Sequence, residues 1–293
     1  EAQFTNSAKV LNNGGIRNEG GFFNNGEFSY DINGSSTFSN FNSFINEGKF
    51  TGIVFSNSGN VYLNPNSEFS VTNATNLAGG GIVNKALFQV DYSFINQGTL
   101  VNEGTAVFQG RFLNNGFFQN ESSATMQINV AESGVLGDAI NYGDLEIAGD
   151  ISAMTAKVLT GNFFNDSTVS FSNVTFEGDI KGSGTTTLGQ NSKVSLGIES
   201  NQNAFVFNQN SHLQLNNDNP DISKNLGSAL TIMGSNAVLT AAGAWSVSGN
   251  ISFSPDLYAA SGLDSLLMIN TSGLDNYLAL TAFQMNVNGA QTA

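Results

Sequence analysis

The sequence predicts an all-β protein whose short strands stack as a single elongated parallel β-helix, a solenoid. Three observations lead to this prediction. Apolar residues recur every six positions over long stretches, Asn and Gly fill the gaps in a nearly fixed pattern, and long amphipathic helical stretches are missing. Because six is an even number, a residue repeated at this step always faces the same side of a strand, whereas on a helix it would move around the axis.

The six-residue step is clearest in the first half of the sequence. It occurs at the start, again from residue 38, and without a break from residue 88 to residue 130. We expect the residues at these positions to point into a common core, because one short unit cannot bury its apolar side chain alone. The three series are Phe4, Val10, Ile16, Phe22 and Phe28; Phe38, Phe44 and Phe50; and Phe88, Phe94, Leu100, Ala106, Phe112, Phe118, Ala124 and Val130.

Asn, a spacer and Gly separate many of these apolar positions. Both residue types tolerate the left-handed backbone of a tight corner, so each hexapeptide is predicted to be a short strand and a corner. About three units would make one coil of roughly eighteen to twenty-four residues. Where equivalent Asn residues lie above one another, we expect their amides to form a hydrogen-bonded ladder. The pairs are Asn12 and Gly14, Asn18 and Gly20, Asn24 and Gly26, Asn46 and Gly48, Asn96 and Gly98, Asn102 and Gly104, and Asn114 and Gly116.

We expect residues 1–293 to form one β-helical rod with three textures. Residues 1–130 carry the regular hexapeptides, residues 131–262 carry looser alternating strand pairs, and residues 263–293 form final coils or a short capping element such as a helix. Three segments rich in turn-forming residues break the rhythm and are predicted to be loop insertions. They are residues 133–141, 216–228 and 255–264.

Composition excludes several classes of function. The net charge is −14, from 23 acidic and nine thinly spread basic residues, so nucleic acid is not an expected partner. The chain has no cysteine, which excludes thiol catalysis, thiolate metal sites and disulfides. No apolar run reaches the roughly eighteen residues that a membrane span needs. No signal peptide pattern follows Glu1, so we expect an interior piece of a longer protein.

Phe-x-Asn-x-Gly units give the sequence a family resemblance. FFNNGEF at 22–28, FINEGKF at 44–50, FINQGTL at 94–100 and FLNNGFF at 112–118 resemble repeats of bacterial autotransporter passenger domains, in particular those of vacuolating-cytotoxin-like proteins of Helicobacter. The resemblance implies a right-handed parallel β-helix, export through the outer membrane, and a place on the bacterial surface or outside the cell. It also implies contact with a host cell-surface protein or glycan. No pore-forming hydrophobic segment is visible, so toxin activity does not carry over.

The function expected from these features is that of a rigid β-helical stalk or adhesin that presents loops to host cells, with self-association as a further possibility. It is not expected to be an enzyme, and no catalytic, cofactor-binding or metal-binding residue is predicted. The alternative is a β-helix that binds or degrades polysaccharides. A groove lined with aromatic and carboxylate side chains would favour that alternative, whereas a face of small polar residues favours the stalk.

Two features resemble functional sites, but their sequence context favours structural roles. His212 lies at an outward strand position with no partner nucleophile nearby in the sequence, so an exposed structural role is expected. The triple glycine at 79–81 lacks the Lys and Ser or Thr of a phosphate loop and is expected to be a corner or a bulge.

Two acidic groups carry the remaining candidates. Oxygen-rich side chains of the kind that calcium binds cluster at Asn216, Asn217, Asp218, Asn219 and Asp221. They lack the ordered spacing of a calcium loop, so a surface loop is favoured. A second set of residues could supply the paired carboxylates that glycoside hydrolysis requires. We favour the interpretation that these residues lie in turns. That set is Asp144, Asp150, Asp166 and Asp179.

Overall fold

The structure is a computed structural model, and it describes residues 3–30, 36–131, 134–149, 157–217, 224–234, 236–242, 244–247, 249–253, 267–271, 277–280, 285–287 and 290–292. Within these ranges the regular structure consists of strands and includes no helix. Nearly all strands pair in parallel and stack as a β-solenoid, as the sequence predicts. Two compact units can be distinguished, Glu1–Leu145 and Glu146–Ala293, and each is described by itself.

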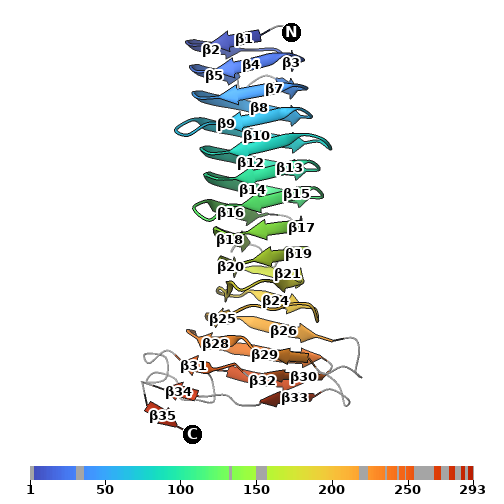
Figure 1. Cartoon of the computed structure of the whole chain (residues 1–293), viewed down its shortest axis with the longest axis vertical. Coiled ribbons are helices and arrows are strands. Elements are labelled where there is room, and N and C mark those ends of the chain that lie inside the picture. Colours follow the sequence, from blue (N-terminus) through green and yellow to red (C-terminus); the bar gives the residue numbers. More distant parts are fainter. Residues whose placement is uncertain are drawn as a thin grey trace. The chain divides into compact units, whose positions relative to one another are not determined.

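The strands of the first unit stack level upon level (Figure 1). Their register pairing arranges them in three faces, each built of parallel strands, which we call A, B and C. Face A consists of β1 (Gln3–Asn6), β4 (Gly21–Asn24), β7 (Ser43–Asn46), β9 (Asn60–Leu63), β11 (Gly81–Asn84), β13 (Thr99–Asn102), β15 (Phe117–Asn120) and the end of β17 (Gly134–Asn141). Face B consists of β2 (Lys9–Asn12), β5 (Glu27–Tyr30), the first halves of β8 (Lys49–Asn57), β10 (Glu68–Asn76), β12 (Leu87–Asn96) and β14 (Thr105–Asn114), and β16 (Thr125–Val130). Face C consists of β3 (Ile16–Asn18), β6 (Thr37–Asn40) and the second halves of β8, β10, β12 and β14.

Each apolar series predicted from the six-residue step lies in the core of the first unit. From Phe88 to Val130 all eight side chains are buried. Phe rings stack on the equivalent ring of the next coil, as Phe28 does on Phe50 with centroids 5.6 Å apart. Rings from different faces meet edge to face, as Phe44 and Phe50 do at 83°. Both arrangements are favourable for aromatic pairs, so a core rich in Phe suits a stacked repeat.

The first coil is the exception to this burial. Phe4 is 46% exposed, although its ring stacks on Phe22 with centroids 4.8 Å apart. Val10 and Ile16 are partly exposed. Their inward positions agree with the prediction, but no described coil lies on their other side.

Buried asparagine ladders run along two edges of the first unit. In one ladder each amide donates to the amide oxygen one coil further on, with spacings of 2.7–2.8 Å between Nδ2 and Oδ1, and equivalent residues are 17–22 positions apart. That ladder is Asn18, Asn40, Asn57, Asn76, Asn96 and Asn114. The second ladder runs from Asn6 through Asn24 to Asn46 and, after an interruption by Leu63, from Asn84 through Asn102 and Asn120 to Asn141. The predicted ladder and coil length are therefore confirmed.

Asn and Gly recur at these corners for a different reason from the one that we predicted. The ladder Asn residues end strands and have no positive φ, and the positive φ values of Asn residues occur elsewhere. Gly48 and Gly116 have no left-handed backbone either. A Cβ on either glycine would lie 2.1 Å from a backbone oxygen of the preceding coil, of Gly26 or Gly98 respectively. Glycine is therefore required here by the close approach of successive coils.

The prediction of a loop insertion at residues 133–141 is wrong for residues 134–141, which the structure describes. Residues Gly134–Asn141 form β17, in which Leu136 and Ala139 are buried. Gly137 has a φ of +65°, which lets the strand bend without leaving the coil. The burial of Leu136 and Ala139 on either side of Gly137 therefore prevails over the turn-forming composition.

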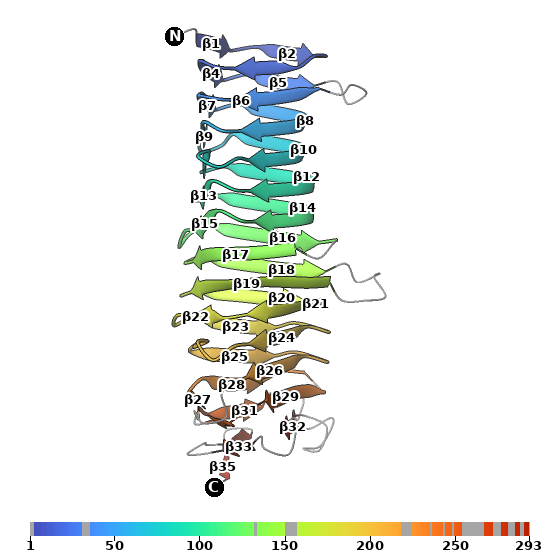
Figure 2. The ribbon, with the colours of Figure 1, turned by 90° about the vertical axis from the view of Figure 1, so that its right-hand side faces the viewer.

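The second unit also consists mainly of parallel strands. By sequence, β18 (Asp144–Gly149) includes residues of both units. Figure 2 shows β19 to β26 as successive levels. Alternating residues such as Phe171, Phe205 and Leu230 are fully buried, as the strand pairs predict. The strands are β19 (Lys157–Asn165), β20 (Thr168–Ser172), β21 (Val174–Gly178), β22 (Ile180–Lys181), β23 (Thr185–Leu188), β24 (Lys193–Leu196), β25 (Ala204–Phe207), β26 (His212–Asn216), β27 (Lys224–Leu226), β28 (Ala229–Ile232), β29 (Ala237–Ala242), β30 (Ala244–Val247), β31 (Ile251–Phe253), β32 (Leu267–Thr271), β33 (Tyr277–Leu280), β34 (Met285–Val287) and β35 (Ala290–Thr292).

An exposed asparagine ladder marks one corner of the second unit. Asn173, Asn191, Asn210 and Asn236 all have φ values between 52° and 58°, and their side-chain amides are hydrogen-bonded in series. The spacing along this ladder rises from 18 and 19 residues to 26 between Asn210 and Asn236. The longer coil contains the predicted insertion at residues 216–228. Its described part adds β27, which pairs with β30, and β30 in turn pairs with β33 in a separate three-stranded sheet.

The last predicted segment, residues 263–293, is described only at its strands. β32 and β34 continue the parallel pairing, whereas β34 and β35 pair in antiparallel fashion. The described parts of this segment are therefore strands, with no capping helix among them. The predicted insertion at residues 255–264 lies outside the described residues.

Candidate interaction surface

His212 begins β26 and is half-buried, so the structure places it deeper than predicted. It pairs in register with Lys193 on one side and Val238 on the other. Its Nε2 atom lies 2.9 Å from the Thr240 hydroxyl. Burial lowers the pKa of His212 below its ordinary value, and the charge of Lys193 lowers it further. These contacts are those of a structural histidine in a strand.

Two of the four candidate carboxylates, Asp166 and Asp179, lie at corners between strands. Asp166, between β19 and β20, accepts hydrogen bonds from the backbone N–H and the hydroxyl of Ser183 at 2.8 and 3.0 Å. Asp179, between β21 and β22, accepts one from the Ser200 hydroxyl at 2.9 Å. The turn interpretation is confirmed for these two residues. Asp144 instead begins β18, and Asp150 lies outside the described residues.

The oxygen-rich cluster is described only in part. Asn216 ends β26, and its amide donates to the Ser195 hydroxyl at 2.8 Å. Asn217 is buried, while Asp218, Asn219 and Asp221 lie outside the described residues. In the part of the chain that the structure describes, no three His, Cys, Asp or Glu side chains come together as a metal site would require.

The triple glycine at 79–81 forms a corner, as predicted. Gly79 has a φ of +84°, and Gly81 begins β11. At Gly80 a Cβ would lie 2.5 Å from the side-chain oxygen of Asn76, so this corner packs tightly against the buried ladder. It has the geometry of a coil corner rather than of a phosphate loop.

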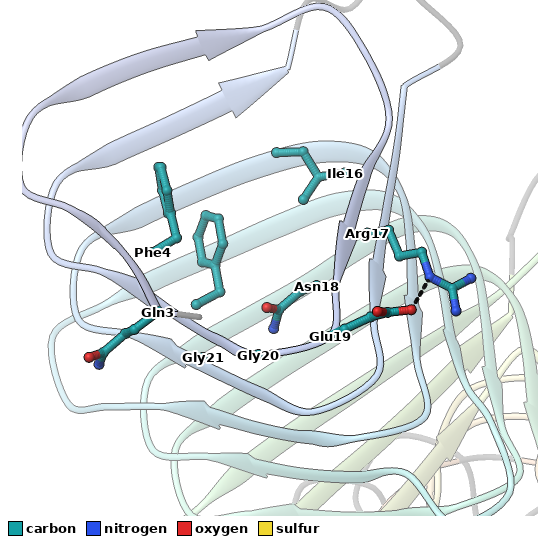
Figure 3. A pocket seen from close by; sticks show the side chains of 9 residues that line it. Gln3, Phe4, Ile16, Arg17, Asn18, Glu19, Gly20 and Gly21 are labelled. Carbon is teal, nitrogen blue, oxygen red and sulfur yellow. Dashed lines mark hydrogen bonds and ion pairs between the residues drawn. The ribbon is translucent and has the colours of Figure 1, made fainter. Parts of the chain in front are cut away.

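The first coil of the first unit surrounds an open pocket of about 460 Å³ (Figure 3). Phe4, Ile16 and Phe22 give it an apolar floor. Arg17 and Glu19 lie at its edge, with 2.7 Å between Nε and Oε1, and the Arg17 guanidinium lies 4.2 Å from the centre of the Phe41 ring. The pocket thus offers apolar contact and one exposed ion pair.

Charged residues on face B form a row of alternating sign. Lys9, Glu27, Lys49 and Glu68 are register partners on successive strands. Lys9 pairs with Glu27 and Lys49 with Glu68, in both cases at 3.0 Å. These pairs are exposed, so each contributes about 0–1 kcal/mol to stability.

Face A carries a row of outward apolar side chains instead. Register pairing places one apolar residue above the next on five successive strands, and these side chains are partly exposed, with Tyr62 at 42%. We call this the apolar row: Phe23, Ile45, Tyr62, Val83 and Val101. The equivalent outward rows of the other two faces mix polar and apolar residues. On face B the row is Leu11, Ser29, Thr51, Ser70, Gln89, Val107 and Gln127, and on face C it is Arg17, Ser39, Ser56, Thr75, Ile95 and Leu113.

Sequence reasoning missed the apolar row because it followed only the inward positions. The signal was available, since the residue after each buried Phe, Val, Ile or Leu of face A is itself apolar in FFN, FIN, VYL, IVN and LVN. Recognising it required knowing which hexapeptides share a face, and that depends on coil lengths that vary from 17 to 22 residues.

Comparisons with known proteins give no assignment. No protein-family model, curated protein or solved structure matches this chain. Across the described residues we find no helix with the length and apolar character of a membrane span.

Proposed function

We propose that this chain is a surface-displayed or secreted passenger segment of autotransporter type, acting as a rigid β-helical stalk that presents loops for host-cell contact. The observation that carries the proposal is the repeated core of the first unit, in which stacked Phe rings and buried Asn ladders recur coil after coil. Such a core resists bending, because each coil is fixed to its neighbours by both side-chain packing and backbone pairing.

Sequence composition supports the same role. A chain without cysteine has no crosslink that would prevent it from crossing an export pore unfolded. Its net charge of −14 favours solubility over aggregation for an elongated β protein. The Phe-x-Asn-x-Gly resemblance gives the proposed family and location.

The residues considered for polysaccharide degradation do not support that alternative function. Asp166 and Asp179 hold corners through Ser183 and Ser200, so one carboxylate oxygen of each is engaged in structural hydrogen bonds. A glycosidase would instead need two carboxylates facing one sugar linkage. The interaction role therefore remains the better supported proposal.

The test is binding of the purified, fluorescently labelled chain to host epithelial cells. We expect saturable binding that unlabelled chain competes away. A heat-unfolded sample serves as control and should not compete. Absence of saturable binding would contradict the adhesin role, and release of reducing or unsaturated ends from a panel of glycans would favour the polysaccharide-degrading alternative.

A further inference from the structure

We propose that Asn13 is a modification site, at which the side-chain amide is lost by deamidation, whereas two corners of the same local sequence are protected by the stacking of the coils. This inference is independent of the proposed stalk function. The triplet Asn-Asn-Gly occurs at residues 12–14, 24–26 and 114–116. Local sequence therefore predicts similar reactivity at the three sites, and the backbone must distinguish them. The second Asn of each triplet is exposed: Asn13, Asn25 and Asn115.

Deamidation at an Asn-Gly pair uses the backbone nitrogen of the glycine as the nucleophile. The Gly14 nitrogen gives its proton to water or hydroxide and bonds to Cγ of Asn13, and the bond from Cγ to Nδ2 breaks. The amide nitrogen takes up a proton from water and leaves as ammonia, so that a cyclic succinimide remains. Water then opens the ring at either carbonyl, which leaves aspartate or isoaspartate. Glycine favours this reaction because it has no Cβ beside the attacking nitrogen.

Hydrogen bonds between coils hold the nucleophile in two of the triplets. The Gly26 N–H donates to the backbone oxygen of Asn6 at 3.2 Å, and the Gly116 N–H donates to that of Asn96 at 3.0 Å. The nitrogen must lose its proton before the ring closes, so these hydrogen bonds have to break first. In a stacked solenoid this requires local opening of the coil, which costs free energy.

Close packing adds to this protection. A Cβ on Gly26 would lie 2.1 Å from the Ala8 backbone oxygen, and one on Gly116 would lie 2.1 Å from the Gly98 backbone oxygen. Isoaspartate inserts a methylene group into the main chain, which shifts the glycine relative to the preceding coil. Backbone neighbours at this distance leave no room for the shift, so the stacked coil opposes the reaction at both triplets.

The corner at Asn13 has neither constraint. Asn13 and Gly14 are both exposed, and a Cβ on Gly14 would meet nothing within 4 Å. In the part of the chain that the structure describes, the Gly14 nitrogen has no hydrogen-bond acceptor. Asn12 donates from Nδ2 to the Gly14 carbonyl oxygen at 2.5 Å, but that oxygen belongs to the next peptide group. Of the three triplets, this one leaves the nucleophile accessible.

The test is incubation of the whole folded chain in mildly alkaline buffer, with peptide mapping by tandem mass spectrometry at successive times. The same chain unfolded in guanidinium chloride gives the reference rate at each site. We expect Asn13 to deamidate at nearly the same rate in both states. Asn25 and Asn115 should react at least about tenfold more slowly in the folded chain, because the coil must open first. The mapping separates these sites from the Asn-Gly pairs at 33–34 and 288–289, which lie outside the described residues.

Gly14→Ala is the matched variant, because it adds a Cβ beside the attacking nitrogen at a corner that has room for it. It should slow deamidation of Asn13 severalfold and leave the rates at Asn25 and Asn115 unchanged, and thermal melting checks that the variant folds. Fast loss at Asn13 alone, suppressed by Gly14→Ala, supports the proposal. Protection of Asn13 equal to that of Asn115 overturns it. Equal folded and unfolded rates at Asn115, or a Gly14→Ala rate equal to that of the parent chain, also overturn it.

Discussion

Asn96 illustrates how one buried amide connects three coils. Its side-chain oxygen accepts from Asn76, and its Nδ2 donates to the side chain of Asn114 and to the backbone oxygen of Phe117. Replacing it by Leu removes these bonds and leaves its partners partly unsatisfied. Leu63 shows that the coil can hold a Leu at the equivalent place in the second ladder.

We therefore predict that Asn96→Leu lowers the free energy of unfolding by about 1–3 kcal/mol in urea titrations. Asn96→Asp should cost more, because it buries a carboxylate whose oxygens face the Asn114 side-chain oxygen. A smaller loss for Asp than for Leu would contradict the ladder's role.

A substitution at Gly116 tests whether successive coils lie too close together to accommodate a Cβ atom. A Cβ there would lie 2.1 Å from the Gly98 oxygen, and its neighbours are backbone atoms that cannot rotate away. We expect Gly116→Ala to lower stability by about 1–3 kcal/mol in thermal melts. Gly14 is the control, since a Cβ there meets nothing within 4 Å. Gly14→Ala should leave stability unchanged or raise it by about 0.4–1 kcal/mol, and equal effects at the two sites would refute the explanation.

His212 should make stability depend on pH. Its pKa is lower in the folded chain than in the unfolded chain, so the unfolded chain binds more protons below about pH 6.5. Stability contributed by the neutral ring is therefore present above pH 6.5 and is lost as the pH falls toward the lower folded pKa. Melting temperatures of His212→Gln should decline less than those of the parent chain between pH 7 and pH 5. Parallel declines would show that the ring has no such role.

Within one strand, the effects of substituting an inward and an outward residue can be compared directly. Phe112 is buried, whereas the next residue, Leu113, points outward on the same strand and is only partly covered. Phe112→Asp should lower the free energy of unfolding by at least about 3–5 kcal/mol and loosen the adjacent coils. Leu113→Asp should cost about 1 kcal/mol. Similar losses for both variants, measured by urea unfolding, would contradict the inward assignment of Phe112.

At this scale the sequence predicted strands and inward residues well, because a six-residue step fixes which side of a strand a residue faces. It did not predict which hexapeptides share a face, because coil length depends on corners such as Gly79 and on the insertion that contains β27. Residue 134 onward was mistaken for a loop, since Gly137 and its neighbours suggest a turn although Leu136 and Ala139 fit the core. The apolar row and the charged row of face B became visible only with the register.

At the scale of the molecule, the two units share one building rule but apply it differently. The first unit has buried Asn ladders and Phe stacks, whereas the second has an exposed ladder of left-handed Asn residues and coils that lengthen toward its end. The most regular packing therefore lies in the first unit.

The stacking of successive coils in the first unit is the claim on which the whole account depends. Register pairing places Leu11, Gln89, Val107 and Gln127 in one outward row of face B. Because the chain has no cysteine, pairs of single cysteines can carry spin labels without interference. Leu11 would be paired in turn with each of the other three positions, and the distance within each pair measured by pulsed electron paramagnetic resonance.

Four, five and six coil steps separate Leu11 from these partners. The account predicts distances of roughly 19, 24 and 29 Å, which rise by about 4.8 Å with each coil. Distances that fail to rise in this order, or that are all similar, would contradict a stacked parallel solenoid.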